Sequence, residues 1–493
     1  MKVERCAAVL TPNPRRVLFR PFGPPPERGI KIVARVMSLE DSEVLRQLEG
    51  VFREFDGRHH DLEALFERRF EQVRQYLVTD AEVSRARRLL LGASFTQEYA
   101  LESSALFNPS IVWHPDQSGL PSGSRRFVLS LRAVGEGHLS CITFRSGVID
   151  SEGLINMDPA QPLVTVPEII EDAPYSRQVF RRMLFERGLL DDFALRLLAR
   201  LDESFTFRQL EANLEIITAE GRQRTESPTN TAELVRALAR ANYDIDYLRG
   251  TDISERVLFP HSPTEINGIE DARFVQFFED DGTSYYVATY TAWDGRMMFP
   301  QLLTTDDFLR FRMRTLSGPQ ATNKGMALFP RRIGGRYAML SRQDNENLFL
   351  MFSDSLYFWY ERTLLIQPTY PWEFLQLGNC GSPLETEAGW LVLTHGVGPM
   401  RKYSIGAILL DLDDPTRVIG RLRDPLMTPN ENEREGYVPN VVYSCGAIVH
   451  GDRLILPYAM ADYASAFATV RLSELLDRLC SSQPSSRALG SRR

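Results

Sequence analysis

The sequence predicts a mainly β protein: a five-bladed β-propeller with an N-terminal helical extension and a helical insertion between the first two blades. Five short aliphatic and aromatic runs support this prediction: RRFVLSLRAV, TSYYVATYTAW, GRYAMLSRQ, GWLVLTHGVG and DRLILPYAMAD. Each follows a Gly- or Asp-containing turn and ends on a polar residue, as expected of strands. The last four recur about every 50–60 residues, a spacing that suits four-stranded blades. The polar strand ends would then converge on an axial channel.

Helical periodicity predicts the two additions to the propeller. Between residues 38 and 100, apolar residues at three- and four-residue spacing occur in DSEVLRQLEGVFREF, DLEALFERRFEQVRQYL and DAEVSRARRLLLGASF. The same period predicts an insertion over about 165–248, in YSRQVFRRMLFERGLLDDFALRLLARL, FTFRQLEANLEIITAEG and TAELVRALARANYDIDYL.

These patterns divide the chain into three parts. Residues 1–100 are expected to form an arm, irregular over 1–30 where proline and arginine are frequent, and then the helical extension. Residues 101–478 are expected to form the propeller with its insertion. Residues 479–493, which include the stretch SSQPSSRALGSRR, have the composition of a disordered tail.

Composition narrows the functional classes. The chain of 493 residues is 43% hydrophobic and 25% charged, which is ordinary for a soluble globular protein. It lacks an apolar run of about 18 residues, so no membrane span is expected. The N-terminus lacks a signal-peptide core, which predicts a cytoplasmic location. The net charge of −8 gives no global attraction to nucleic acid, so an anion site must be a local basic cluster. The five cysteines lack C-x-x-C spacing, and neither a disulfide framework nor a metal site is predicted.

The stretch INGIEDARF, residues 266–274, places two acids and an arginine inside an apolar run. On an extended strand, Asp271 and Arg273 would share one face and Glu270 would take the other. One interpretation is an ordinary salt bridge on an edge strand. The other is a carboxylate at a strand end in a polar pocket, held by its own arginine.

Seven blocks occur in one order along the chain: ALFNPSIV, LSLRAVGEGHLS, NGIEDARFV, NKGMALFPRRIGGRYAMLSR, GNCGSPLETEAGWLVLTHGVG, LLDLDDPTRVIGR and GYVPNVVYSCG. Together they resemble glycoside hydrolase family 130, the β-mannoside phosphorylases and β-mannosidases, over about residues 105–475 without the insertion. The resemblance implies a five-bladed propeller with its site in the axial funnel, in agreement with the strand repeat. It also implies cleavage of a β-mannoside with inversion. In the phosphorylases, phosphate attacks and α-mannose 1-phosphate leaves.

The resemblance assigns the catalytic role to the INGIEDARF stretch. Asp271 matches the family's catalytic acid, with Ala272 where the E-D-P-R motif has proline. Arg273 is expected to hold the Asp271 carboxylate or the sugar, and Glu270 to make a structural bond. An inverting phosphorylase needs one protein acid and no protein base, because phosphate is itself the nucleophile.

A phosphate nucleophile needs fixed cations at short range. Lys324 and Arg342 match two phosphate-binding positions of the family, although each alone would be an ordinary surface charge. The family's third cation is a lysine in a P-P-I-K-T stretch, where this chain has SPLET and therefore Glu385. A carboxylate beside phosphate is repulsive, whereas a water nucleophile needs such a base. Glu385 thus keeps hydrolysis open, with Arg401 and Lys402 as candidate replacements for the missing charge.

The matching blocks also supply the expected sugar-binding residues, because sugar hydroxyls need paired donors and acceptors. Asn108 and Asn440, each beside a proline, could instead be plain turn residues. Asp462 could be a loop carboxylate, and His395 a core histidine. The full expected set is Asn108, Arg132, Arg273, His395, Tyr403, Asn440 and Asp462.

Three functions remain open at this level. Phosphorolysis to α-mannose 1-phosphate is favoured because two of the three phosphate cations are present. The alternative is an inverting β-mannosidase with Glu385 as base, and the second alternative is a non-catalytic glycan-binding propeller. No metal or cofactor is expected beyond inorganic phosphate as co-substrate. The expected partner is a β-linked manno-oligosaccharide or mannoside, without nucleic acid or membrane partners. A homo-oligomer through the helical extension, the linkage and the acceptor sugar are left open.

Overall fold

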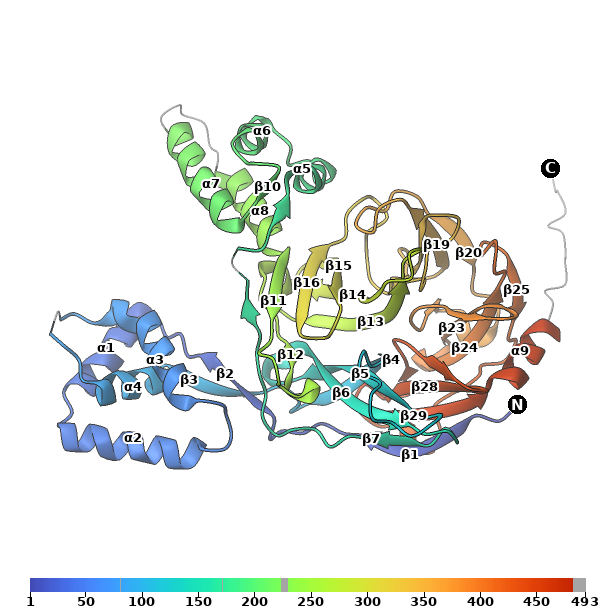
Figure 1. The fold of residues 1–493 in the computed structure, drawn as a ribbon, viewed down its shortest axis with the longest axis horizontal. Coiled ribbons are helices and arrows are strands. Elements are labelled where there is room, and N and C mark those ends of the chain that lie inside the picture. The colour runs from blue at the N-terminus through green and yellow to red at the C-terminus, as the bar shows by residue number, and fades with distance from the viewer. Residues whose placement is uncertain (80, 171, 223–228, 482–493) are drawn as a thin grey trace.

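Strands dominate the chain after residue 95, and most belong to five separate antiparallel sheets (Figure 1). The computed structural model describes residues 1–79, 81–170, 172–222 and 229–481. Each of the five predicted runs lies in a different sheet, where it is the second strand from one edge. These second strands are β5 (Arg125–Val134), β14 (Ser284–Trp293), β18 (Tyr337–Ser341), β23 (Gly389–Val397) and β28 (Arg453–Met460).

One edge strand of each sheet, here called its lead strand, pairs with the second strand. The lead strands are β4 (Ala105–Trp113), β13 (Ile269–Phe278), β17 (Ala327–Leu328), β21 (Gln376–Asn379) and β26 (Val442–Tyr443). The remaining strands of the first two sheets are β6 (Ser140–Ile149), β7 (Ile155–Met157) and β12 (Val257–Leu258), then β15 (Met298–Thr305), β16 (Arg310–Thr315), β11 (Tyr243–Asp246) and β8 (Glu168–Ile169). Those of the other three are β19 (Leu348–Ser353) and β20 (Thr363–Ile366), then β22 (Leu384–Thr386), β24 (Tyr403–Leu410) and β25 (Val418–Arg421), then β27 (Ile448–His450) and β29 (Ala464–Arg471).

The N-terminus belongs to the fifth sheet. Strand β1 (Glu4–Leu10) pairs antiparallel with β29, so the first and last strands of the chain lie side by side (Figure 1). Strand β2 (Val17–Pro21) pairs with β3 (Thr96–Ala100). The prediction of an irregular arm over residues 1–30 is therefore wrong, because pairing partners far along the chain order these segments.

Neighbouring sheets pack through aromatic side chains. Phe144 of the first sheet lies 6.0 Å, centroid to centroid, from Phe274 of the second, and 5.7 Å from Phe308. All three rings are buried. These two edge-to-face pairs add about 0.5–1.5 kcal/mol each beyond burial. They pack β13 against β6, a strand of the sheet whose lead strand is β4.

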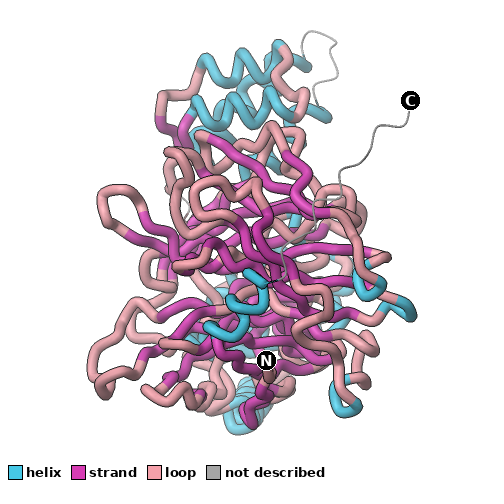
Figure 2. The backbone as a smooth tube through the Cα atoms, turned by 90° about the vertical axis from the view of Figure 1, so that its right-hand side faces the viewer, coloured by secondary structure: helices cyan, strands magenta, loops and turns pink. Residues whose placement is uncertain are grey.

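Two groups of helices extend from the strands on one side of the molecule (Figure 1), and Figure 2 shows the second group beyond the sheets. The first group is α1 (Pro26–Met37), α2 (Asp41–Phe55), α3 (Leu62–Val73) and α4 (Arg85–Ser94), and the second is α5 (Arg177–Glu186), α6 (Asp192–Ala199), α7 (Phe207–Arg222) and α8 (Thr229–Arg240). The predicted helix over TAELVRALARANYDIDYL runs too far, because its residues Tyr243–Asp246 form strand β11. There Tyr243 and Ile245 alternate with acids and pair with β16.

The C-terminal helix α9 (Leu472–Ser481) buries Leu475 and Leu479. The predicted disordered tail therefore begins too early, because the first of its residues are helical. The rest, 482–493, lies outside the described residues.

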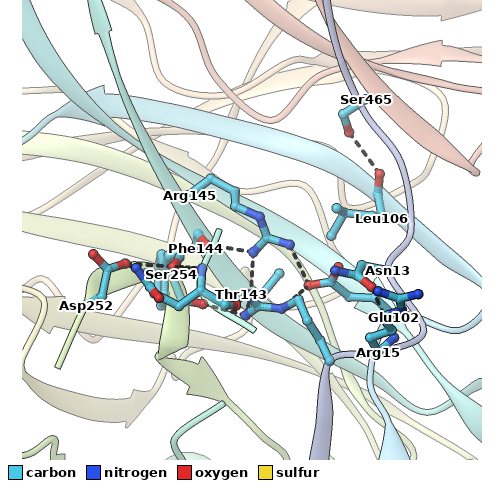
Figure 3. A network of polar contacts seen from close by, with 12 residues as sticks. Asn13, Arg15, Glu102, Leu106, Thr143, Phe144, Arg145, Asp252, Ser254 and Ser465 are labelled. Carbon is cyan, nitrogen blue, oxygen red and sulfur yellow. Dashed lines mark hydrogen bonds and ion pairs between the residues drawn. The ribbon is translucent and has the colours of Figure 1, made fainter. Parts of the chain in front are cut away.

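A buried charge cluster fixes the N-terminal segment against the first sheet (Figure 3). Glu102 Oε1 lies 3.0 Å from Arg16 Nε in an ion pair and accepts a 2.7 Å hydrogen bond from Arg145 Nη2; the Glu102 side chain is fully buried. Arg16 also donates to the carbonyl of Gln161. Two guanidinium groups on one carboxylate compensate the cost of burying these charges. The cluster joins the segment before β2, the loop after β3 and strand β6.

Candidate active site

In four of the five sheets, a non-glycine residue with left-handed backbone lies where the lead strand reaches the site. Asn108 (φ 50°), Asp271 (φ 52°), Asn323 (φ 64°) and Asn440 (φ 63°) lie in or just before lead strands. A non-glycine residue in this region is strained, and Asn and Asp tolerate it best. Such strain typically collects at functional sites. The paired registers of β4 and β13 are also interrupted, between Phe107 and Ser110 and between Glu270 and Arg273.

Asp271 sits in a tight polar arrangement with groups from two other sheets. Asn108 Nδ2 donates a 2.7 Å hydrogen bond to Asp271 Oδ1. Arg132 Nη1 lies 3.6 Å from the same oxygen, and Arg132 Nη2 donates to Glu270 Oε1 at 2.8 Å. Lys324 Nζ lies 3.8 Å from Glu270 Oε2. The structure thus brings together the predicted residues Asn108, Arg132, Asp271 and Lys324.

The expectation that Glu270 and Asp271 occupy opposite strand faces is wrong. Alternation requires a regular extended backbone. The interrupted register and the left-handed Asp271 remove this alternation, so both carboxylates turn toward Arg132. The expected structural bond of Glu270 is therefore an ion pair within the site.

The surroundings of Asp271 and Asp462 shift the pKa values of their carboxyl groups in opposite directions. Burial alone would raise the pKa of Asp271, but Arg132 and Lys324 hold it below its usual value. The Asn108 hydrogen bond acts in the same direction. Burial, followed by the nearby Asp271 charge, raises the pKa of Asp462 to about 7. One carboxyl is thus ionised at neutral pH while the other titrates there.

Arg273 does not hold Asp271 through a hydrogen bond in the described structure. Its Nη1 donates to the carbonyl of Asn379 at 2.8 Å, and its Nη2 donates to the Tyr443 hydroxyl at 2.5 Å. Both partners belong to the fourth and fifth sheets. Arg273 acts on Asp271 only through its charge, which helps to lower the pKa of that carboxyl. Sequence reasoning missed Asn379 and Tyr443, although both lie in the resemblance blocks.

Arg342 and His395 form a second buried part of the site. A Cβ on Gly325 would lie 2.5 Å from Arg342 Nε, and a Cβ on Gly378 would lie 2.4 Å from His395 Cε1. Only glycine allows this close packing. Arg342 Nε and His395 Nε2 have no hydrogen-bond partner among the described residues. Buried polar atoms of this kind call for a ligand or water.

His395 is a neutral, fully buried imidazole. Burial, then the charges of Arg342 and Arg273, holds its pKa well below the usual value. Its Nδ1 lies 3.3 Å from the carbonyl of Asn379. Its ring stacks on Tyr403 with centroids 6.2 Å apart. His395 is therefore both a buried core histidine and a residue of the site, because its ring faces the arginines there.

Three predicted residues have side chains that lie outside this cluster. Asn440 Oδ1 accepts a 2.7 Å bond from Arg434 Nε, and its carbonyl accepts from Tyr403 N. These bonds match the turn interpretation. Arg401 and Lys402 are exposed at the short helix η6 (Pro399–Arg401) and the residue after it.

Glu385 lies at a different place. Its two oxygens accept 2.8 Å bonds from Arg331 Nε and Nη2, and it lines a cavity that also contacts Trp113, Val275 and Ile448, here called the apolar pocket. Asp271 lines a separate narrow cleft, here called the Asp271 cleft, with Arg273, Thr289, Lys324 and Gly325 among its walls. Along β13, Asp271 precedes Val275 by four residues, roughly 13 Å of strand. The prediction of Glu385 as a base acting opposite Asp271 is therefore not supported.

The charges around Asp271 leave an excess of positive charge. The cations are Arg132, Arg273, Lys324 and Arg342, and the carboxylates are Glu270, Asp271 and Asp462. Four cations against three ionised carboxylates give +1, or +2 when Asp462 is protonated. Because the whole chain carries −8, this local excess is a specific feature. It suits a dianionic ligand.

Comparison with known proteins places the chain among carbohydrate-active enzymes. The profile of one family, described as β-1,4-mannooligosaccharide phosphorylase, matches residues 239–481. A 1,2-β-oligomannan phosphorylase of Thermoanaerobacter sp. (strain X514) is 31% identical over 253 residues, covering 50% of this chain and 82% of the relative. The chain belongs to glycoside hydrolase family 130. A β-1,2-mannobiose phosphorylase of Listeria innocua is 34% identical over 230 residues, 45% of this chain and 63% of that protein.

Among solved structures, the Listeria innocua β-1,2-mannobiose phosphorylase in complex with β-1,2-mannobiose is 23% identical. It covers 76% of this chain and 92% of its own, with a TM-score of 0.45. Within the part of the chain that is described, we find no cluster of three or more metal-ligating side chains. None of the helices described is both long and apolar enough to cross a membrane.

Proposed function

We propose that this protein is an inverting β-mannoside phosphorylase that transfers a mannosyl unit to inorganic phosphate. The observation that carries the proposal is the cation cluster beside Asp271, in which Lys324, Arg273 and the buried Arg342 leave the cleft with excess positive charge. The family relatives, which are named as phosphorylases, support it.

Phosphate and mannoside have distinct places in this proposal. Phosphate is held by Lys324 and Arg342, with Arg273 as the third cation in place of the expected lysine. The mannosyl unit is held by Asn108, Arg132 and Asp462. His395 and Tyr403, stacked beside Arg342, border both parts.

Asp271 supplies the proton. A phosphate oxygen attacks the anomeric carbon, the bond to the bridging oxygen breaks, and that oxygen receives the proton by way of a sugar hydroxyl. Asp271 is held ionised in the free enzyme, so it must gain a proton before the reaction. Binding of dianionic phosphate next to it favours this, because a neighbouring negative charge raises a carboxyl pKa. The products are α-mannose 1-phosphate and the shortened sugar.

The same contacts support a propeller. Contacts join residues in or beside the lead strands of all five sheets: Asn108 bonds Asp271, Lys324 pairs with Glu270, and Arg273 bonds Asn379 and Tyr443. We propose that the sheets are blades of a five-bladed propeller spanning residues 101–478, with β1 added to the last blade. The two helix groups, α1–α4 and α5–α8, are additions outside it, and their surfaces are available for a homo-oligomer.

One experiment tests the function. The protein is incubated with β-1,2- and β-1,4-mannobiose, with and without phosphate, and products are followed by ³¹P and ¹H NMR. We expect turnover only with phosphate, giving the α anomer of mannose 1-phosphate. Free mannose at equal rates in both conditions would show a hydrolase that uses another base. Sugar binding without turnover on either linkage would favour the glycan-binding alternative.

A further inference from the structure

The apolar pocket is a sizeable cavity that the proposed reaction does not use. It encloses about 480 Å³. Sites for small organic ligands typically enclose roughly 300–1,000 Å³, with mostly apolar walls and a few polar groups. Its walls include Val112, Trp113, Val275, Leu384 and Ile448, one or more residues from each of four sheets. Pro330 and Arg331, beside the third sheet, complete it.

The pocket is separated from the Asp271 cleft by direct packing of the lead segments. Phe274 N donates to Ser110 Oγ at 3.0 Å, and Cys445 N donates to the Pro109 carbonyl at 2.9 Å. A Cβ on Gly446 would lie only 2.8 Å from Ser110 Oγ. These contacts lie between the site residues and the pocket residues of β4, of β13 and of the segment after β26. The pocket is therefore not a lower part of the sugar funnel.

The pocket carries one uncompensated positive charge. Arg331 is neutralised by its two bonds to Glu385. Arg125 lies with its guanidinium carbon 3.9 Å from the centroid of the Trp113 ring. Within the described residues, we find no hydrogen bond or ion pair for the side chain of Arg125, which is exposed, although its partial burial lowers its pKa. A guanidinium on an aromatic face presents a planar fork that can bind an anion bidentately.

A further polar group in the pocket is also unsatisfied. Ser382 Oγ is buried without a hydrogen-bond partner among the described residues. It is a neutral donor or acceptor, so it adds no charge. The pocket thus combines apolar walls, one free cation and one free hydroxyl.

We propose that the apolar pocket binds a small organic anion, with an aryl or alkyl body against Val112, Val275 and Ile448 and a carboxylate or sulfonate on Arg125. The site is distinct from the phosphorolysis site and does not depend on the proposed function. A sugar is a poor occupant because its hydroxyl groups would meet apolar walls. A bare phosphate would leave those walls exposed to water.

The probe is 8-anilinonaphthalene-1-sulfonate, titrated into the intact protein and followed by its fluorescence. We expect one saturable site per chain, from which octanoate displaces the probe and β-mannobiose does not. Arg125→Gln should weaken binding at least tenfold, and Arg125→Lys should weaken it less because the charge remains. N-phenyl-1-naphthylamine, which has a similar body without charge, should bind the wild type and Arg125→Gln equally.

The matched control is Arg126→Gln, since Arg126 bonds the Asp116 carbonyl and does not line the pocket. Its affinity for the probe should equal that of the wild type, with all variants melting within a few degrees of it. Equal probe affinity in the wild type and Arg125→Gln would overturn the proposal. Displacement by β-mannobiose would overturn it too, because it would place the probe in the Asp271 cleft. Phosphorolysis, measured separately, is not affected by either outcome.

Discussion

The two ends of β13 lie in opposite chemical surroundings. Near its start, Asp271 is left-handed and faces Arg132, Lys324 and Asn108. Toward its other end, Val275 lines the apolar pocket with Trp113 and Leu384. The strand between them is regular and buried against β14. Ordinary β packing can therefore support two unlike sites, and the irregular backbone at one end gathers the charges there.

The same contrast applies to acids. Glu270 and Asp271 lie beside Arg132 and Lys324 near the Asp271 cleft, whereas Glu385 pairs with Arg331 at the partly exposed apolar pocket. The family motifs predict that Glu385 and Asp271 belong to one site. The packed layer at Ser110 and Gly446 separates them.

The largest expected effect is at Asp271, near the start of β13, where the backbone is left-handed. Asp271→Asn removes the proposed proton donor without changing side-chain size, so kcat should fall by about 10²–10⁴-fold. Initial rates of mannose 1-phosphate formation provide the measurement, with the melting temperature and mannobiose binding as controls for the fold. Retention of more than a tenth of the wild-type rate would remove Asp271 from the catalytic role.

A smaller effect is expected at the buried guanidinium. Arg342→Lys keeps the charge but loses the planar fork, so the KM for phosphate should rise by about 10–100-fold. The KM for the mannoside should change little. The matched control at the opposite end is Arg331→Lys, whose ion pair with Glu385 lies in the apolar pocket. A similar rise in both variants would refute a specific phosphate role for Arg342.

Asp462 should make the stability of the fold pH-dependent. Its pKa is raised to about 7, so the folded state keeps a proton that the unfolded chain releases near pH 4. The folded state therefore binds more protons between about pH 4 and 7, and the free energy of unfolding falls as pH rises through that window. Asp462→Asn removes this loss. Its melting temperature should therefore exceed that of the wild type by more at pH 8 than at pH 5.

The control for this experiment is Asp280→Asn, an exposed acid on the turn after β13. It should shift the melting temperature equally at both pH values. A pH-independent difference between Asp462→Asn and the wild type would show that Asp462 is ionised throughout.

The smallest effect is expected at Glu385, which lines the apolar pocket. Glu385→Gln breaks an exposed ion pair with Arg331, which contributes at most about 1 kcal/mol. Turnover should stay within twofold of the wild type, with and without phosphate. A loss of most activity would restore Glu385 as a catalytic base and would break the distinction between the two ends of β13.

Much of the architecture follows from local sequence patterns. The strand runs in all five sheets and the bounds of α2 follow from periodicity, because each buries one face against a neighbour. Periodicity did not reveal β1, since its partner β29 lies more than 450 residues away. It also extended α8 into β11, whose pairing with β16 outweighs helical propensity.

By itself, the sequence determined the residue types of the site, the family and the position of Asp271 in its motif. Only the tertiary structure decided which of these residues meet. In the folded chain, Glu270 and Asp271 both turn toward Arg132. Arg273 donates to Asn379 and Tyr443, and Glu385 lines another cavity. The physical reason is that strand pairing fixes alternation only along regular backbone. A left-handed residue and a break in register are set by contacts between sheets, which no local pattern records.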